Sequence, residues 1–278
     1  MVRRGKKNET IAGVEIGTKS IKIVIAEILP DQSLKVIGHG ETPSLKVQKG
    51  EITDVNSVFK QLDKTAKKAE KDAETRIKNV YIAVTGGHIK TLNNRGSLPI
   101  VNSNKRITED DVVNVTRNAR TVSLPHDCEM IDSLHRHYII DNARSVQNPI
   151  NIAGSKLEAE VHIIYGSRNN LHTTLNVVED YFSAPCEDII FSGICAAYGA
   201  LTDEDNEKGA LVIDIGAGTT EYVLNHDRAC LHSGVITVGS NQILNDLTLG
   251  LKLPSGKCRA ILENYGAALS KADGRSRL

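Results

Sequence analysis

Tryptophan is absent from this sequence, and aromatic residues are scarce. Phe, Trp and Tyr together make up 4% of the 278 residues. Proteins that bind single-stranded nucleic acid stack the bases on aromatic side chains, so this composition argues against such a platform. The formal net charge is zero, with 34 basic and 34 acidic residues, which gives no general attraction to polyanions. We therefore expect no nucleic-acid partner.

Paired cysteines and long apolar runs are also lacking. The five cysteines show no Cys-x-x-Cys spacing, which indicates reduced thiols in a cytosolic protein rather than a metal or disulfide framework. No apolar run reaches the length of a membrane span, and no signal peptide is visible. The basic segment Arg3–Lys7 is interpreted as a solvated arm, with weak attraction to an anionic membrane surface as the alternative.

Two short stretches, about two hundred residues apart, repeat one pattern. They are Gly13–Ser20 and Val212–Thr220. Each holds a β-branched apolar run with one carboxylate, then glycine and hydroxyl residues, and then leads into a second apolar run. This order predicts a strand, a tight turn and a second strand, occurring twice. Two ordinary hairpins are the alternative, but the shared order of acid, isoleucine and glycine favours a common chemical role.

The residue types in the two turns suit a nucleotide phosphate chain and its metal ion. Glycine allows close approach of the backbone to an anion, successive N–H groups form an anion-binding nest, and hydroxyls add donors. A carboxylate does not bind phosphate favourably, so Glu15 and Asp214 are expected to hold Mg²⁺, usually through water. The residues expected to bind phosphate are Gly17, Thr18, Lys19, Ser20, Gly216, Ala217, Gly218, Thr219 and Thr220.

The patterns around each motif predict an α/β fold in which a β-β-β-α-β unit occurs twice. In the first unit a helix is expected after a cap at Asp54 or Asn56, with these residues facing inward: Val55, Phe59, Leu62, Ala66, Ala69 and Ala73. The polar stretch Glu204–Gly209 is interpreted as a linker. The expected strands are Thr10–Glu15, Ile21–Ile28, Leu34–Gly38 and Asn79–Val84, then Leu211–Ile215, Thr220–Leu224 and Ala229–Val235.

A segment of different texture, Gly87–Glu158, is interpreted as an α+β insertion. Short strands are expected at Ser97–Val101 and Tyr138–Ile140, with a helix that begins after the capping residue Thr108. One loose cluster in this segment suggests either a metal site or cross-strand packing, and its spacing favours packing. The cluster consists of His126, His135, His137, Tyr138 and Asp141.

The expected domain partition is 1–86 and 159–201 for the first half, 87–158 for the insertion and 202–278 for the second half. The second half has opening strands and two helices, but not the further strands that a complete repeat needs. Strands Leu211–Ile215 and Thr220–Leu224 should then be partly uncovered. At roughly 25 cal/mol per Å² of apolar surface, this predicts marginal stability or a fragment of a longer protein.

With these motifs the chain resembles the actin-like (ribonuclease H-like) ATPase superfamily and, within it, the FtsA family of bacterial cell-division proteins. The resemblance covers about residues 10 to 266, and the insertion after Gly87 is what specifies FtsA. The supporting stretches are Gly13–Lys22, Lys49–Asp54, Val80–Ile89, Asn93–Ile100, Ile107–Val112, Asn148–Glu158, Glu160–His162 and Asp214–Thr220.

The resemblance implies an ATP- and Mg²⁺-binding protein that polymerises and links the FtsZ ring to the inner face of the cytoplasmic membrane. It also implies self-association into filaments and contacts with other division proteins. By the same resemblance, Gly239 is the glycine of the loop before the next helix. Glu15 stands where much of the superfamily has Asp.

The chain departs from the FtsA pattern at three points. The family usually offers Glu and, three residues later, Lys to the ribose and adenine, and these positions align with Arg259 and Leu262. Leu244 replaces a threonine. The chain stops before the last glycines, the remaining subdomain and the C-terminal amphipathic helix that resembles a membrane anchor, so a truncation is expected.

Three alternatives to an active scaffold remain. An enzyme on this fold, such as a kinase, would need a positioned base, and the sequence shows no convincing one, so ATP hydrolysis is expected to be weak or absent. A degenerate or truncated homologue would act through the insertion as a non-enzymatic interaction module. A related actin-like ATPase of pilus assembly is the third.

Overall fold

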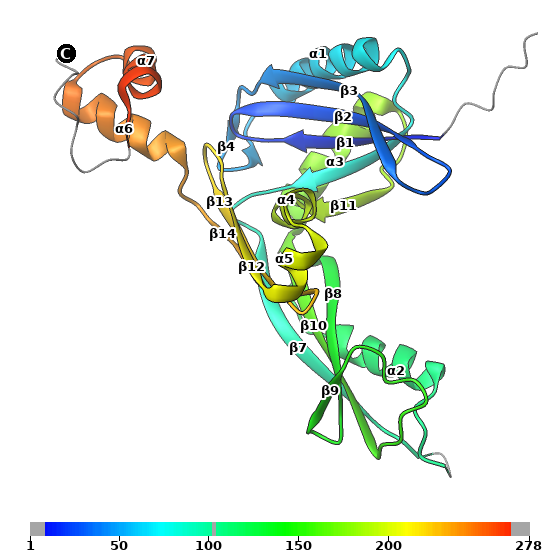
Figure 1. Cartoon of the computed structure of the whole chain (residues 1–278). Coiled ribbons are helices and arrows are strands. Elements are labelled where there is room, and N and C mark those ends of the chain that lie inside the picture. The colour runs from blue at the N-terminus through cyan, green and yellow to red at the C-terminus, as the bar shows by residue number, and fades with distance from the viewer. Residues whose placement is uncertain (1–8, 102–103, 268–278) are drawn as a thin grey trace, which may run out of the picture.

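The computed structural model describes residues 9–101 and 104–267, and the segment Arg3–Lys7 and the chain after 267 lie outside them (Figure 1). The first half is built on a five-stranded sheet in the order β11-β6-β1-β2-β3. β1 pairs antiparallel with β2 and parallel with β6, which makes it a central strand. The strands are β1 (Thr10–Ile16), β2 (Ser20–Ile28), β3 (Leu34–Pro43), β6 (Asn79–Val84) and β11 (Asp188–Phe191), beside a small hairpin of β4 (Val47–Gln48) and β5 (Glu51–Ile52).

Helix α1 (Val55–Ala73) packs on β2 and β3, and also against α3 (Arg168–Phe182). The predicted cap is Asp54, whose carboxylate accepts the Ser57 backbone N–H at 3.0 Å. The α1 residues buried against the core include Val58, Leu62, Ala66 and Ala69. The buried stripe therefore includes the predicted Leu62, Ala66 and Ala69, and Ala73 is partly buried against the same core.

The prediction was wrong for Val55 and Phe59, which are 46% and 37% exposed. Val58 takes the place of Phe59 on the inward face because the spacing of Val58, Leu62 and Ala66 follows one side of the helix. Phe59 instead contacts Tyr181 of α3 edge to face, with ring centroids 5.4 Å apart. An aromatic side chain here joins two helices rather than a helix and the sheet.

The insertion forms a separate lobe with its own sheet, in the order β7-β10-β8-β9, and its own core (Figure 1). Helix α2 (Glu109–Arg120) covers one face, and its capping box at Thr108 is formed as predicted. The strands are β7 (Lys90–Pro99), β8 (Cys128–Ile140), β9 (Arg144–Val146) and β10 (Lys156–Ser167). β10 is continuous across residue 158, where the insertion was expected to end.

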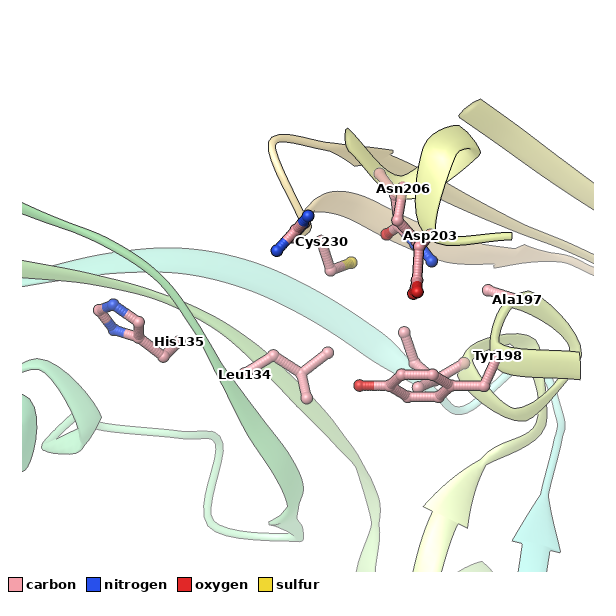
Figure 2. A pocket seen from close by; sticks show the side chains of 10 residues that line it. Leu134, His135, Ala197, Tyr198, Asp203, Asn206 and Cys230 are labelled. Atoms are coloured by element: carbon pink, nitrogen blue, oxygen red, sulfur yellow. The ribbon is translucent and has the colours of Figure 1, made fainter. Parts of the chain in front are cut away.

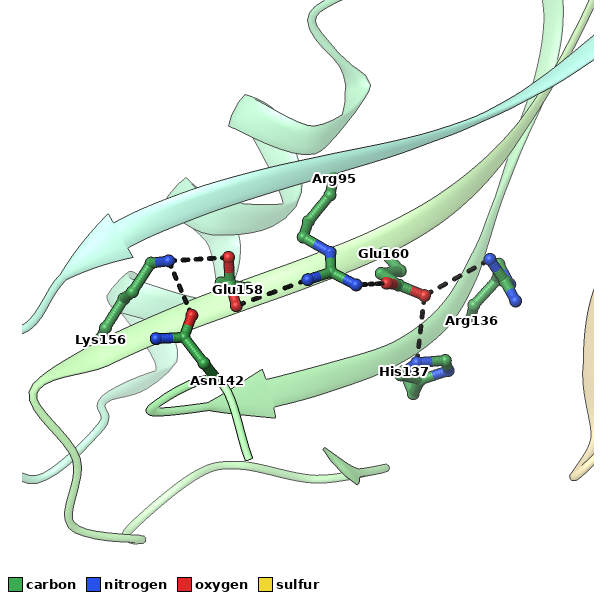
Figure 3. Close-up of polar contacts among 7 residues, drawn as sticks. All are labelled: Arg95, Arg136, His137, Asn142, Lys156, Glu158 and Glu160. Atoms are coloured by element: carbon green, nitrogen blue, oxygen red, sulfur yellow. Dashed lines mark hydrogen bonds and ion pairs between the residues drawn. The ribbon is translucent and has the colours of Figure 1, made fainter. Parts of the chain in front are cut away.

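The other face of β10 carries an ion cluster (Figure 3). Glu160 pairs with Arg95, with Arg136 at 3.3 Å and with His137 at 3.1 Å. The nearly buried Glu158 pairs with Lys156 at 2.9 Å. The pairs of Glu160 connect β10 with β7 and β8. They also supply the compensating partners that a buried carboxylate requires.

The residues of the candidate histidine cluster make several separate contacts. His137 belongs to the ion cluster, and His135 packs against Tyr138 with ring centroids 4.2 Å apart. Asp141 accepts the backbone N–H groups of Ser155 and Lys156, each at 2.9 Å. Among the described residues, no group of three acids, histidines or cysteines is arranged to hold a metal ion. These contacts are of the kind that the cross-strand packing interpretation predicts.

The second half repeats the opening of the first with a three-stranded sheet in the order β12-β13-β14. The stretch predicted as a linker is instead α5 (Asp203–Lys208), because Thr202 and Asp205 form a capping box. In Figure 1, α6 and α7 project away from this sheet and pack against each other. The elements are α4 (Ser192–Ala200), β12 (Ala210–Ile215), β13 (Thr220–His226), β14 (Ala229–Ile236), α6 (Ser240–Leu251) and α7 (Ser255–Tyr265).

Among the described residues, one apolar face of the second sheet is partly uncovered, as expected. Leu211, Ile213 and Ile215 alternate along β12 and are 56%, 55% and 68% exposed. β12 is an edge strand among the described residues, whereas the equivalent β1 has β6 on its far side. None of the helices in the described residues is long and apolar enough to cross a bilayer.

Ile213→Ala should therefore change the free energy of unfolding by less than about 0.5 kcal/mol, because little apolar surface is lost from a buried site. Ile82→Ala is the matched control, since Ile82 on β6 is 1% exposed, and its loss should cost about 2–5 kcal/mol. Urea denaturation measures both. A cost at Ile213 similar to that at Ile82 would mean that this face is covered in solution.

Candidate functional site

The two repeated motifs form turns that are closed by the same backbone hydrogen bond. The N–H of Gly17 donates to the carbonyl of Ser20 at 3.0 Å, and the N–H of Gly216 donates to the carbonyl of Thr219 at 2.9 Å. Each turn links two antiparallel strands, β1 to β2 and β12 to β13. The hairpins also share their register, since Glu15 lies opposite Lys22 and Asp214 lies opposite Glu221.

The turns touch each other through backbone and small side chains. A Cβ atom added to Gly218 would lie 2.7 Å from the Thr18 hydroxyl and 2.9 Å from the Lys49 Cα, so only glycine fits there. The Thr18 hydroxyl accepts the N–H of Gly50 at 3.0 Å. Gly50 has a φ of +79°, which a side chain would strain. The Lys49–Gly50 turn thus joins the two motifs, a role that their sequence did not reveal.

A cavity of about 290 Å³ lies between the turns. Both predicted carboxylates, Glu15 and Asp214, line it. Of the predicted phosphate-binding residues, these line it: Gly17, Thr18, Lys19, Ser20, Gly216, Ala217, Gly218 and Thr219. The other lining residues are Lys22, Glu41, Thr85, Ile215, Glu221 and Ser240. The two turns therefore face one shared space.

Two predicted residues, Thr220 and Gly239, do not line the cavity. The Thr220 hydroxyl donates to the carbonyl of Val238 at 2.8 Å. Gly239 packs against the Ala217 backbone, where a side chain would not fit. The backbone N–H of Ser240, next in the chain, donates to the Gly216 carbonyl at 2.9 Å. Gly239 thereby attaches the start of α6 to the second turn.

The two carboxylates differ in their surroundings. Glu15 is half-buried, and its Oε2 lies 3.2 Å from Lys22 Nζ. Burial lowers the pKa of Lys22, but the carboxylate of Glu15, with smaller contributions from Glu41 and Asp214, more than offsets this, so the net pKa is raised and Lys22 stays charged. Asp214 is exposed and forms no ion pair with a described residue. Of the two acids, Asp214 is the one that is available to a cation.

Another acid that lines the cavity, Glu221, is buried and was missed by the sequence reasoning. It is 4% exposed, and Thr85 donates a hydrogen bond to its Oε1. Ser192 Oγ lies 2.7 Å from its Oε2 and 3.0 Å from the Val84 carbonyl. The pKa of Glu221 is raised to about 7, mainly by burial; the charges of Asp214 and Glu15 add to the rise, and the hydrogen bonds from Thr85 and Ser192 oppose it.

The chemistry of the cavity fits a hydrated Mg²⁺ with a phosphate chain. Mg²⁺ keeps several waters and is commonly held by one or two carboxylates together with substrate phosphates, and Glu15 and Asp214 supply two such groups. The glycine turns supply backbone N–H groups, while Lys19 and Lys22 supply positive charge. Glu221 is buried and hydroxyl groups already engage both of its carboxylate oxygens, which makes it less suited than Asp214 to be a direct metal ligand.

The three residues that depart from the FtsA pattern lie on the α6–α7 hairpin. Leu244 is 8% exposed and is buried on α6, which packs against α7. Leu262 is half-buried, and its carbonyl accepts the N–H of Gly266 at 2.9 Å. Arg259 is exposed and lines a second cavity beside the first turn. Only Arg259 of the three is thus placed to meet a ligand.

Another cavity, of about 320 Å³, lies away from the turns, between β8, α4, α5 and β14 (Figure 2). Its lining includes His135, Tyr198, Asp203 and Cys230. Burial lowers the pKa of His135 and raises that of the Cys230 thiol to about 11, so neither a charged imidazole nor a reactive thiolate is favoured. This cavity offers less chemistry than the one between the turns.

Comparison with known proteins agrees with the resemblance. Residues 86–165 match the family described as the SHS2 domain inserted in FtsA, and residues 211–277 match cell division protein FtsA. The cell division protein FtsA of Escherichia coli (strain K12) is 31% identical over 265 residues, which cover 95% of this chain and 62% of that protein. The FtsA of Pseudomonas aeruginosa is 29% identical over 97% of this chain and 64% of its own length.

Solved structures show the same fold at low sequence identity. The PilM–PilN type IV pilus biogenesis complex contains a chain that matches with a TM-score of 0.67 and 15% identity, over 92% of this chain and 70% of that chain. MreB5 of Spiroplasma citri bound to ADP matches with a TM-score of 0.51 and 12% identity, over 96% and 66%. The chain spans less than two thirds of the length of the FtsA relatives named above. It belongs to the FtsA family of bacterial cell-division proteins and has the actin-like fold.

Proposed function

We propose that this chain is an ATP-binding scaffold of cell division that polymerises and links the FtsZ ring to the cytoplasmic membrane. The observation that carries the ATP-binding part is the single cavity on which both repeated turns and both carboxylates converge. The backbone N–H groups of the turns hold the phosphates, and Glu15 and Asp214 hold Mg²⁺ through its waters. When bound, the metal neutralises the charge of the phosphate chain.

The division role is proposed from membership of the FtsA family. It comprises filament formation by copies of this chain, contacts with FtsZ and other division proteins, and a position at the inner face of the plasma membrane at the division site. The insertion lobe supports it, because its sequence matches the domain that is inserted in FtsA. The pilus-assembly alternative is supported by the fold alone, at 15% identity.

Hydrolysis of the bound ATP is proposed to be weak or absent. Phosphoryl transfer needs a group that orients or deprotonates the attacking water. Glu221 is the buried acid of the cavity, but Thr85 and Ser192 already engage its two carboxylate oxygens. A water molecule would have to compete with these two hydroxyls for the carboxylate.

Isothermal titration of MgATP into the wild-type chain and into Gly218→Ala tests this function. The wild type should bind, and the variant should bind at least tenfold more weakly, because the added methyl group meets Thr18 and Lys49. Gly13→Ala is the matched control, since a Cβ there meets no atom within 4 Å. Electron microscopy of the same samples checks for filaments with MgATP.

A wild-type chain that binds no MgATP would overturn the proposal. The alternative of a non-enzymatic interaction module would then stand, with the insertion lobe as the binding surface. Equal binding by Gly218→Ala and the wild type would place the nucleotide away from the two turns. MgATP binding without filaments would contradict only the polymerisation part of the proposed function.

A further inference from the structure

A second cavity, of about 530 Å³, adjoins the one between the turns. The two share Thr18, Lys19, Ser20, Glu41 and Ala217 as walls. A phosphate chain held by the turns would thus lie next to this second space, which offers room for the rest of a nucleotide. The remaining lining residues are Thr42, Pro43, Ser44, Asn241 and Arg259.

Two cations line this second cavity, and one carboxylate accompanies them. Lys19 comes from the first turn, Arg259 comes from α7, and Glu41 comes from β3. Within the described residues, neither Lys19 nor Arg259 forms an ion pair, and both are exposed to the cavity and solvent. The side chains that reach this space thus carry an excess of positive charge that the protein does not neutralise.

The position of Arg259 is fixed through α6 and α7. The backbone N–H of Asn241, near the start of α6, donates to the Ala217 carbonyl at 3.0 Å, which ties the helix to the second turn. α7 packs on α6, and its Cys258 is fully buried with its thiol 3.6 Å from the Leu253 carbonyl. Arg259 directly follows this anchor. The guanidinium is therefore presented to the cavity by a packed element.

An arginine at the sugar end of a nucleotide site has a recognisable chemistry. A carboxylate hydrogen-bonds the free hydroxyls of a ribose, whereas an arginine accommodates a phosphate on that ribose in dinucleotide enzymes. The planar guanidinium donates two parallel hydrogen bonds to phosphate oxygens, which an ammonium group does not do. An uncharged ribose offers no such acceptor pair to Arg259.

We propose that the second cavity binds a phosphate carried on the ribose, at the 2′ or 3′ position, of a nucleotide whose 5′-phosphates lie on the two turns. Arg259 holds this additional phosphate, and Lys19 lies between it and the 5′ chain. The proposal rests on the proposed nucleotide-binding function. It makes Arg259 the residue that determines specificity at the sugar end.

Titration calorimetry with magnesium and three probes tests the proposal: ADP, ADP phosphorylated on the 2′ hydroxyl and ADP phosphorylated on the 3′ hydroxyl. The wild-type chain should bind one of the phosphorylated probes at least tenfold more tightly than ADP, and the preferred probe identifies the position. Arg259→Gln should reduce that preference to less than twofold and leave the ADP affinity unchanged. Lys257→Gln is the control, because Lys257 is exposed on the same helix but does not line the cavity.

The outcomes separate this inference from the function on which it rests. Equal binding of all three probes by the wild type would overturn the inference and leave the nucleotide site in place. Arg259→Gln could instead weaken the binding of ADP as much as that of the phosphorylated probes. Arg259 would then act on the 5′-phosphates or close the cavity against Glu41, and the inference would again fall. If none of the probes bound, the proposed function would fail as well.

Discussion

Replacing Asp214 with alanine is expected to weaken MgATP binding by about 10–100-fold, the usual cost of removing a group that supports a bound metal. Asp214 is exposed in the cavity and forms no ion pair with a described residue, so its charge is available to the hydrated cation. Glu15 cannot fully replace it, because Lys22 lies 3.2 Å from the Glu15 carboxylate. The larger loss is therefore expected at Asp214 and the smaller at Glu15.

Calorimetric titration of ATP with and without Mg²⁺ measures this effect. Without the metal, wild type and Asp214→Ala should bind ATP similarly or the variant slightly better, because a carboxylate near the phosphates is removed. Asp246→Ala is the control, since Asp246 is an exposed acid of α6 outside the cavity. An Asp214→Ala variant with the full magnesium dependence of the wild type would show that the metal is held elsewhere.

The strands and turns around the site could be predicted because their signals are local. Alternating β-branched residues mark β1, β2, β12 and β13, and glycine marks both turns. The contact of Gly218 with Thr18 and Lys49 could not be predicted, since it depends on how two distant hairpins meet. Local sequence gives the parts of the cavity, and tertiary packing brings them together.

The errors have physical reasons of the same kind. The short strand expected at Ser97–Val101 is instead the longer β7, because the polar segment from Asn93 to Gly96 also pairs residue by residue with β10. Gly96 is needed there because the backbone of Ala119 in α2 approaches it closely. The missed helix α5 is an error of another kind. Its signal is local, because the capping pair Thr202 and Asp205 is visible in the sequence.

Glu221 was missed although one signal was available. It alternates with Val223 along β13, and both side chains are buried, so an acid occupies an inward position of a strand. Such an acid requires partners. Its partners Thr85 and Ser192 come from distant segments, and their convergence could not be read from the sequence. An acid at an inward strand position next to a glycine turn is therefore worth testing as a site residue.

Glu221→Gln is expected to stabilise the chain above pH 7 and to have little effect near pH 4. The pKa of Glu221 is raised from an ordinary value of 4.5 to about 7 in the folded state. Between these values the folded chain binds more protons than the unfolded chain, so this group makes stability fall as pH rises. Above pH 7 the full cost is about 3 kcal/mol, which glutamine avoids because it stays neutral.

The hydrogen bonds around Glu221 agree with a neutral side chain. Ser192 has one hydroxyl hydrogen, but both the Val84 carbonyl and a Glu221 oxygen lie within reach of its Oγ. A protonated Glu221 can donate to Ser192 while Ser192 donates to Val84, and the amide N–H of a glutamine can do the same. An ionised carboxylate would compete with the carbonyl for one hydrogen.

Urea denaturation from pH 4 to pH 8 should be read as the difference between Glu221→Gln and wild type. The wild-type curve alone mixes opposite slopes, because burial lowers the pKa of His162 to about 4. The unfolded chain then binds more protons between pH 4 and 6.5, so His162 makes stability rise with pH. The difference cancels the contribution of His162, since both proteins contain it.

Glu41→Gln, at an exposed glutamate of the same cavity, should stay within about 0.5 kcal/mol of wild type at each pH. Parallel curves for wild type and Glu221→Gln would mean that Glu221 is ionised in the folded chain at neutral pH and that its surroundings stabilise the charge.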